Sequence, residues 1–497
     1  MAKKPLQKLR EFFGPGYDAR SLQLDEKKQL RLSLQSETRK MRRRILKRSG
    51  GNHPDPSIRA AARRHAADKT RALRKKLVRT SNDIPPFGEL LRKFKSSPLL
   101  DNLDPARPQE WRPIIARSYR SDYRRLRLGP LNFLDDPVGT ISQLQSLAKI
   151  ERSEVNAFID FTDERCLDVG AYLVLAEIWP QMSHVFRGGV MSQSVQKVLS
   201  AMELDKDLGI GLSSVRDHRQ VSAFPIVRRR PRQTSTDPNR QLKPADREKL
   251  ADKLVGLIDD WLWIACFEKK AETALELSGK GKGLIQNMVG ELLCNAERHS
   301  IPGSVDGDWS MSAFMAAREA QDGALKFHCY LSFLNVGQSI AQSMSKAPAE
   351  ILSKTESYLA KHKDGVLSED GLMTVLALQD TITSKSYSDE FGRGGTGLQD
   401  VLEVAGDLGA CNVPGSDVRV TIVSGNSCIR LGNPILAGVT DKFGRRLQWC
   451  NRENNPELPP DSSVAFKLPA HFAGTLVSVG FTLDPQLLIP KEEDDAN

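Results

Sequence analysis

The sequence predicts a mixed α/β protein with a basic helical arm at its N-terminus. Between about residues 157 and 485, runs that alternate like β-strands are interspersed with runs that have the 3.6-residue period of amphipathic helices. The first 80 residues are instead dominated by Lys, Arg, Ala and Gln. At 497 residues, the chain is long enough for about two to four domains and a substantial buried core.

The charge is divided unevenly between the arm and the rest of the chain. The formal net charge is +10, but residues 1–95 hold 27 Lys and Arg against 9 Asp and Glu. Of the totals of 72 basic and 62 acidic residues, 45 and 53 remain for the rest, a balance of −8. We therefore expect a polyanionic partner for the arm only.

The arm itself is expected to form two helices. Residues 21–48 have the composition of a charged helix, residues 50–56 interrupt it, and Ser57 can cap a second helix toward Leu77. Such helices can lie on nucleic acid through phosphate contacts, although the arm is poor in aromatic residues. A solvated basic helical hairpin is the first interpretation, and nucleic-acid binding is the alternative.

Cysteine usage and hydropathy indicate the compartment. The seven cysteines are scattered and never in C-x-x-C spacing, which argues for reduced thiols rather than a disulfide framework or a structural zinc site. The apolar run Trp261–Phe267 is too short to span a bilayer, and the N-terminus lacks the apolar core of a signal peptide. We expect a soluble, cytoplasmic protein without membrane contact.

Residues 96–225 are expected to combine a Pro- and Arg-rich connecting region with a small α/β domain. A β-like run at 158–161, a short loop and an apolar helix at 171–179 are followed by a helix-like run at 195–204. This succession resembles a STAS domain, the fold of anti-sigma factor antagonists, whose loop before the helix is a contact and phosphorylation site. Here that loop, 167–170, contains Asp168 and no obvious phosphorylatable serine. The resemblance implies a protein-binding module without a phosphorylation switch.

The next stretch predicts a domain boundary. Residues 226–245 are polar and rich in Pro and Arg, as in an exposed linker. Pro244 begins a helical pattern that continues to about Leu277, and residues 279–283 are expected to separate this helix from the following one.

Gln286–Ser300 predicts an amphipathic helix with an unusual polar face. Glu291, Asn295 and His299 recur every four residues and therefore lie along one line of the helix. A carboxylate, a carboxamide and an imidazole on one face are poorly placed for a core. They are well placed to line a ligand site.

This helix closely resembles the N-box of the GHKL superfamily, whose ATP-binding Bergerat fold is a two-layer α/β sandwich. The superfamily includes sensor histidine kinases, anti-sigma serine kinases, MutL-type repair ATPases, type II topoisomerases and heat-shock chaperones. The resemblance implies ATP and Mg²⁺ as cofactors, with Asn295 as the metal ligand. It makes Glu291 the catalytic base that acts on a water or a substrate hydroxyl, and it places His299 at the nucleotide.

The segment after this helix resembles the first glycine box of the superfamily. There, a strand leads into D-x-G-x-G, and the aspartate accepts a hydrogen bond from the adenine amino group. Here, Asn335 replaces the aspartate, Gly337 matches the first glycine, and Ser339 replaces the second. A carboxamide oxygen can still accept that hydrogen bond, although without the strength that a charge adds.

A glycine-rich loop resembles the second glycine box. It leads into a helix-like run, so bare backbone N–H groups can face phosphates at a helix N-terminus. The segment between the boxes, about 341–391, corresponds to the ATP lid. The resemblance assigns nucleotide contacts to Arg393, Gly394, Gly395, Thr396, Gly397 and Leu398.

The remaining sequence completes the predicted domain. Residues 417–430 are expected to form a hairpin with its turn at Gly425, and residues 474–483 resemble the closing Gly-Thr strand. The acidic tail is expected to be disordered. The predicted organisation is an arm (1–95), a connecting region with a STAS-like domain (96–225), a linker (226–245), a GHKL domain (246–485) and a tail (486–497).

Several GHKL functions can be compared. A sensor histidine kinase is disfavoured because none of the eight histidines is followed by an acidic residue. The STAS-like unit favours a Mg·ATP-dependent regulatory switch, an ATPase or a protein Ser/Thr kinase, with Glu291 as the base. A nucleotide-binding scaffold without turnover and a DNA-associated GHKL ATPase that uses the basic arm are the alternatives. A homodimer is also left open.

Overall fold

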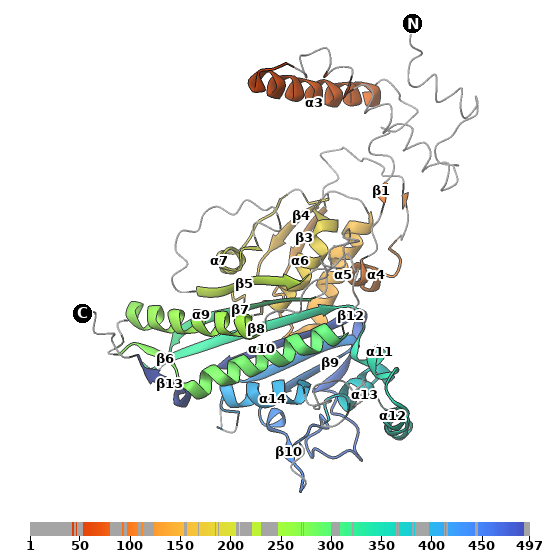
Figure 1. Cartoon of the computed structure of the whole chain (residues 1–497). Coiled ribbons are helices and arrows are strands. Elements are labelled where there is room, and N and C mark those ends of the chain that lie inside the picture. The colour runs from red at the N-terminus through yellow and green to blue at the C-terminus, as the bar shows by residue number, and fades with distance from the viewer. Residues whose placement is uncertain are drawn as a thin grey trace. The chain divides into compact units, whose positions relative to one another are not determined.

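Figure 1 shows the computed structural model of the chain, in which two compact units are formed by residues 1–95 with 108–123 and by residues 96–107 with 124–497. The structure describes residues 42–43, 46, 53–79, 92–93, 97–107, 111–112, 124–153, 157–166, 168–183, 185–186, 188–204, 208, 221–229, 247–269, 271, 273–299, 309–320, 323–363, 365, 367–379, 382, 397–411, 413, 416–442 and 446–491.

The first unit contains the second helix predicted for the arm. This helix, α3, spans Pro56–Arg79. The Asp55 carboxylate accepts the backbone N–H of Ser57 at 2.7 Å, so Asp55 occupies the capping position that the sequence assigned to Ser57. Two short strands, β1 (Arg92–Lys93) and β2 (Trp111–Arg112), pair antiparallel. Most of the helix predicted over 21–48 lies outside the described residues.

The second unit is built around a five-stranded antiparallel sheet with the strand order β5-β7-β8-β12-β9 (Figure 1). Along β8, Leu331 and Phe333 belong to one buried cluster, whereas Tyr330 and Leu334 belong to another. Both faces are therefore apolar and both require a cover. The strands are β5 (Val221–Arg229), β7 (Trp309–Glu319), β8 (Leu325–Val336), β12 (Ala465–Thr482) and β9 (Arg419–Gly432).

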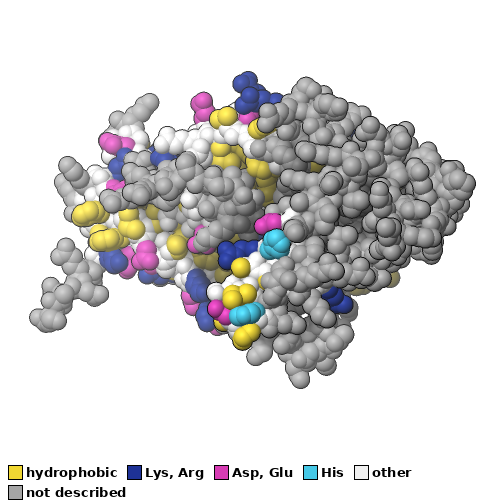
Figure 2. All heavy atoms as spheres, turned by 90° about the horizontal axis from the view of Figure 1, so that it is seen from above, with side chains coloured by type: hydrophobic (Ala, Val, Ile, Leu, Met, Phe, Trp, Pro, Cys, Tyr) yellow, Lys and Arg dark blue, Asp and Glu magenta, His cyan; other side chains and the backbone are white. Residues whose placement is uncertain are grey.

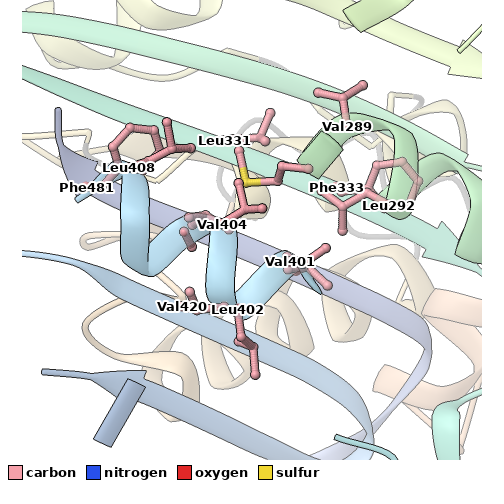
Figure 3. Close-up of a cluster of buried hydrophobic side chains, with 14 of the residues drawn as sticks. Val289, Leu292, Leu331, Phe333, Val401, Leu402, Val404, Leu408, Val420 and Phe481 are labelled. Carbon is pink, nitrogen blue, oxygen red and sulfur yellow. The ribbon is translucent and has the colours of Figure 1, made fainter. Parts of the chain in front are cut away.

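Three helices cover one face of this sheet, namely α9 (Arg247–Glu268), α10 (Gly279–His299) and α14 (Gly397–Leu408). In Figure 3, side chains of α14 such as Val404 gather with Leu331 of β8 and with Val289 of α10. Burying a side chain of this kind contributes about 1.5–3 kcal/mol. The predicted helix over 286–300 and the predicted strands over 326–335 and 474–483 are confirmed within α10, β8 and β12.

The described residues of 97–107 and 124–208 form a second layer on the opposite face of the sheet. Strand β3 pairs in parallel with β4, and Phe186 and Met191 continue this pairing beside β4. The predicted strand and both predicted helices of this region are present. The fold is thus mixed α/β as predicted, but its sheet is covered on both faces rather than on one. The elements are α4 (Pro98–Leu103), β3 (Arg124–Leu128), α5 (Pro137–Ser153), β4 (Ala157–Phe161), α6 (Gly170–Met182) and α7 (Gln193–Ala201).

A row of small hydroxyl side chains crosses the sheet where it meets this layer. In register, Ser312 of β7 lies opposite Ser332 of β8, which lies opposite Ser478 of β12 and then Thr421 of β9. All four are buried. The hydroxyls of Ser332 and Ser478 are 3.2 and 3.1 Å from Oδ1 of Asp168. The row therefore provides hydrogen-bond donors for one buried carboxylate.

Asp168 stands directly before α6 and has no exposed surface. Its Oδ1 also accepts the backbone N–H of Gly170 at 2.7 Å, and its Oδ2 accepts that of Phe133 at 2.6 Å. The loop that the STAS resemblance implies as a partner contact is therefore packed against the sheet of its own chain. Burial raises the pKa of Asp168, while these four donors oppose that rise.

Helices and small strands border the sheet after β8 (Figure 1). The predicted lid segment contains α11 (Ile340–Met344), α12 (Ala349–His362) and α13 (Glu369–Leu376). After β9 come the 3₁₀ turn η2 (Ile435–Ala437) and the antiparallel pair β10 (Val439–Thr440) and β11 (Arg446–Leu447). On the described part of the face in Figure 2, acidic and basic side chains are interspersed among apolar ones. Among the described residues, no helix is long and apolar enough to cross a membrane.

Three predicted boundaries are wrong because tertiary pairing or capping decides them. The first predicted helix ends at Glu268 rather than near 277, because Leu275–Leu277 forms β6 and pairs with β13 (Leu488–Pro490). The same pairing orders part of the predicted disordered tail, after η3 (Pro485–Leu487). Residues 279–283 begin α10, because the Ser278 hydroxyl accepts the N–H of Gly281 at 3.2 Å.

Two further differences concern the sheet. Residues 226–229 belong to edge strand β5, so the predicted linker starts too early, and residues 230–246 lie outside the described part. The predicted hairpin at Gly425 is also wrong. Gly425 has a φ of 58°, yet β9 continues through it, because β12 bends alongside with two shifts in register.

We expect Asp168→Asn to destabilise the protein by about 1–3 kcal/mol. The carboxamide would turn its NH₂ group toward the N–H of Phe133 or Gly170, which would leave a buried donor unpaired. Denaturant unfolding followed by tryptophan fluorescence measures this change. Because the pKa of Asp168 is raised in the folded chain, wild-type stability falls as pH rises through that pKa, and the difference from the variant should shrink.

The exposed Asp260 of α9 offers a matched control for this substitution. Asp260→Asn should change the free energy of unfolding by less than about 0.5 kcal/mol. Equal losses in the two variants would contradict the role assigned to Asp168.

Candidate functional site

The polar face of α10 meets the start of α14. Glu291 and Asn295 are one helical turn apart and half-buried. A Cβ atom built on Gly397, the first residue of α14, would lie 2.7 Å from Nδ2 and 2.9 Å from Oδ1 of Asn295. It would also lie 3.0 Å from Oε2 of Glu291. The structure therefore brings together three residues that the sequence assigned to one site, and a side chain at Gly397 would displace the ends of the other two.

Asn335 lies at the end of β8, beneath the same helix. It is 5% exposed, and its Nδ2 donates to the carbonyl of Ala296 on α10 at 3.5 Å. Its Oδ1 is buried and has no hydrogen-bond partner among the described residues. The Nδ2 of Asn295 is likewise buried and unpaired within this part of the chain. Because unpaired buried polar atoms are costly, each marks a place where a ligand can complete the hydrogen bonding.

The closing strand meets Asn335 at very short range. Thr475 of β12 is the register partner of Asn335, and Gly474 before it has a φ of 117°. A Cβ at Gly474 would lie 2.0 Å from the Asn335 carbonyl oxygen, so any side chain would push the two strands apart. The Thr475 hydroxyl is thereby fixed beside the Asn335 side chain on the helix-covered face.

Ser424 links this pair of strands to the next helix. Its hydroxyl is 3.0 Å from that of Thr475, donates to the Gly474 carbonyl at 2.9 Å, and accepts the N–H of Ile340 at 2.8 Å. The first residue of α11 is therefore tied to the sheet beside Asn335. Thr475 and Ser424 are not among the residues that the sequence predicts for this site. The Gly-Thr start of the closing strand could have indicated Thr475.

The predicted residues of the first glycine box have different roles. Gly337 has a φ of 152°, a conformation that favours glycine. Ser339 is fully buried and caps α11: its hydroxyl accepts the N–H of Gln342 at 3.2 Å, and the Gln342 side chain accepts the N–H of Ser339 at 3.0 Å. The structure thus gives the Ser339 hydroxyl the role of a helix cap.

The second glycine box is described only in part. The Leu398 side chain packs against the large apolar core, so it has a structural role. His299 ends α10, but its side chain is outside the described set. The remaining predicted contacts, Arg393, Gly394, Gly395 and Thr396, lie outside the described residues.

The described side chains do not form a preassembled metal cage. Among them, no group of three or more His, Cys, Asp and Glu residues could hold a metal ion. Mg²⁺ bound to phosphates needs only one or two protein ligands and keeps waters for the rest, so a single amide oxygen is compatible with such a site.

Comparison with known proteins identifies no relative of this chain. No protein-family model matches it, and neither a curated protein nor a solved structure matches it. The interpretation of the site therefore depends on its geometry and chemistry.

Proposed function

We propose that residues 246–491 form a nucleotide-binding domain of the GHKL superfamily, which binds Mg·ATP against the polar face of α10. The observation that carries this proposal is the buried Oδ1 of Asn335 beside Thr475, which has no hydrogen-bond partner in the described part of the chain. The adenine amino group is a donor and would satisfy it. The bond from Nδ2 of Asn335 to Ala296 keeps the acceptor end of the carboxamide free for the base.

The start of α14 suits the phosphates. A helix N-terminus carries partial positive charge and N–H groups without partners inside the helix, and Gly397 lets the side-chain ends of Asn295 and Glu291 lie close to this backbone. We assign Asn295 to the metal ion. When bound, Mg·ATP supplies a γ-phosphoryl group for transfer to water or to a hydroxyl. Glu291 would accept the proton of that attacking group.

The architecture supports a regulatory form of this activity. The antiparallel sheet with α9, α10 and α14 on one face has the layers of a Bergerat domain, and we interpret the described residues of 97–107 and 124–208 as a STAS-like module on the other face. Asn335 and Ser332 are three residues apart on β8, and Thr475 and Ser478 are three apart on β12. The nucleotide site and the module contact therefore share two strands. This supports a regulatory ATPase or a protein Ser/Thr kinase whose state the module can influence.

Calorimetric titration of the full chain with Mg·ATP tests the proposal. We expect binding that Asn295→Ala weakens at least tenfold, because the metal would lose its only assigned protein ligand. Gln286→Ala is the control, since Gln286 is an exposed carboxamide of the same helix that lies off the line of Glu291 and Asn295, and this variant should bind as the wild type does. Absence of binding in the wild type, or equal weakening by both substitutions, would refute the site.

A second titration tests the role of Asn335. Inosine triphosphate presents a carbonyl where ATP presents the amino group, so the wild type should prefer ATP by about tenfold, the value of one hydrogen bond. Asn335→Leu removes the acceptor at similar size and should bring this preference close to one. A preference that persists in Asn335→Leu would show that another group selects the base.

Turnover separates an enzyme from a nucleotide-binding scaffold. Glu291→Gln keeps the size of the side chain but cannot take a proton, so ATP hydrolysis should fall by about 10²–10⁴-fold while ATP affinity is retained. Phosphate release measured beside the calorimetry gives both quantities. Binding without turnover in the wild type would favour the scaffold, and unchanged turnover in the variant would exclude Glu291 as the base.

A further inference from the structure

A cavity of about 510 Å³ lies between α12, the end of α13 and the segment 447–457. This volume lies in the range of small-molecule sites. Its lining includes Tyr358 and Lys361 of α12 and Trp449 of the later segment. None of its lining residues belongs to the polar face of α10 or to the strand ends beside Asn335.

Hydrogen bonds join the segments that form the walls of the cavity. Gln379 donates to the carbonyl of Gln448 at 2.7 Å and accepts the N–H of Gln448 at 2.9 Å. On the other side, the His362 ring is 3.0 Å from the carbonyl of Pro456. Asn454 accepts the N–H of Trp449 at 2.7 Å. The cavity is therefore preformed, because hydrogen bonds fix both of its sides.

Two residues of this lining carry donors that have no acceptor among the described residues. Tyr358 is 7% exposed, and its hydroxyl is buried without a hydrogen-bond partner among the described residues. The indole N–H of Trp449 is buried and unpaired in the same part of the structure. The two rings lie 5.4 Å apart with a tilt of 36°. Because burial raises the pKa of Tyr358, the hydroxyl keeps its proton and stays a donor for any acceptor that reaches it.

The same lining carries positive charge. Lys354, Tyr358 and Lys361 are spaced by four and three residues and therefore share one face of α12. Lys354 pairs with Glu350, and Lys361 pairs with Glu457 at the rim. These pairs are largely exposed, so each contributes little and can be exchanged for a stronger partner.

We propose that this cavity binds a small aromatic anion, a ring that carries a carboxylate or a phosphate. The apolar side chains of Leu376, Ile382 and Leu447 suit the ring. The anionic oxygens suit the ammonium groups of the two lysines and the donors of Tyr358 and Trp449, for which the described residues offer no acceptor. An aliphatic anion would leave the apolar wall uncovered, and a neutral ring would leave the lysines with their weak surface partners.

Calorimetric titration of the full chain with indole-3-acetate and with phenyl phosphate tests the site and distinguishes the two sources of charge. We expect at least one to bind, and its neutral or aliphatic counterpart, indole-3-acetamide or methyl phosphate, to bind at least tenfold more weakly. Tyr358→Phe should weaken binding by about 2–10-fold, the value of one hydrogen bond. Lys361→Gln should weaken it and reduce its dependence on salt.

Two further variants distinguish a loss of the binding site from a loss of folded protein. Glu457→Gln removes the carboxylate that competes for Lys361 and should tighten binding, which misfolding cannot do. Lys363→Gln changes an exposed lysine just after α12, outside the cavity lining, and should leave affinity unchanged. No binding of either anion at millimolar concentration would overturn the proposal. So would affinity that neither Tyr358→Phe nor Lys361→Gln alters. Tyr358, Lys361 and Lys363 lie in the segment predicted as the ATP lid, but none of the substituted residues is assigned a contact with the nucleotide.

Discussion

The buried carboxylate of Asp168 joins the two halves of the larger unit. Four donors surround it, two from the backbone around α6 and α5 and two from serines on neighbouring strands of the sheet. A carboxyl group at this depth is costly unless it is hydrogen-bonded, so Asp168 is tolerable only while all of these groups are in register. The position of α6 over the sheet is thus tied to the pairing of β8 with β12. A slip of either strand by one residue would turn its serine to the opposite face.

This constraint also fixes the site on the other face. The strands that place Ser332 and Ser478 under α6 also place Asn335 and Thr475 under α10. At that end, the approach of Gly474 to the Asn335 carbonyl leaves no room for a side chain, so the same register is specified twice. A sheet whose register is fixed in this way forms a rigid base for the candidate site. The parts free to respond to a ligand are therefore the helices and segments above it.

Periodicity predicted the elements that have one clear face. The four-residue repeat of Glu291 and Asn295 located the polar side of α10, and the glycine-rich stretch that ends at Gly397 located the start of α14; the GHKL resemblance implied that the two meet. Sequence alone did not predict the features that depend on contacts between residues far apart in the chain. Asp168 meets serines that are 164 and 310 residues away. β6 is too short to be recognised without β13, and the polar composition of the predicted linker concealed edge strand β5.

The helices after β8 connect the two candidate binding places. At their start, the N–H of Ile340 is held by Ser424 beside Thr475, so α11 cannot shift without disturbing the floor of the site at α10. At their end, Gln379 is bonded in both directions to Gln448, so the segment after α13 is held to the far wall of the second cavity. The intervening α12 carries Tyr358 and the two lysines. A ligand that pulls α12 toward Trp449 would therefore act on a segment anchored at the first site, and coupling between the sites requires only that this segment move as a body.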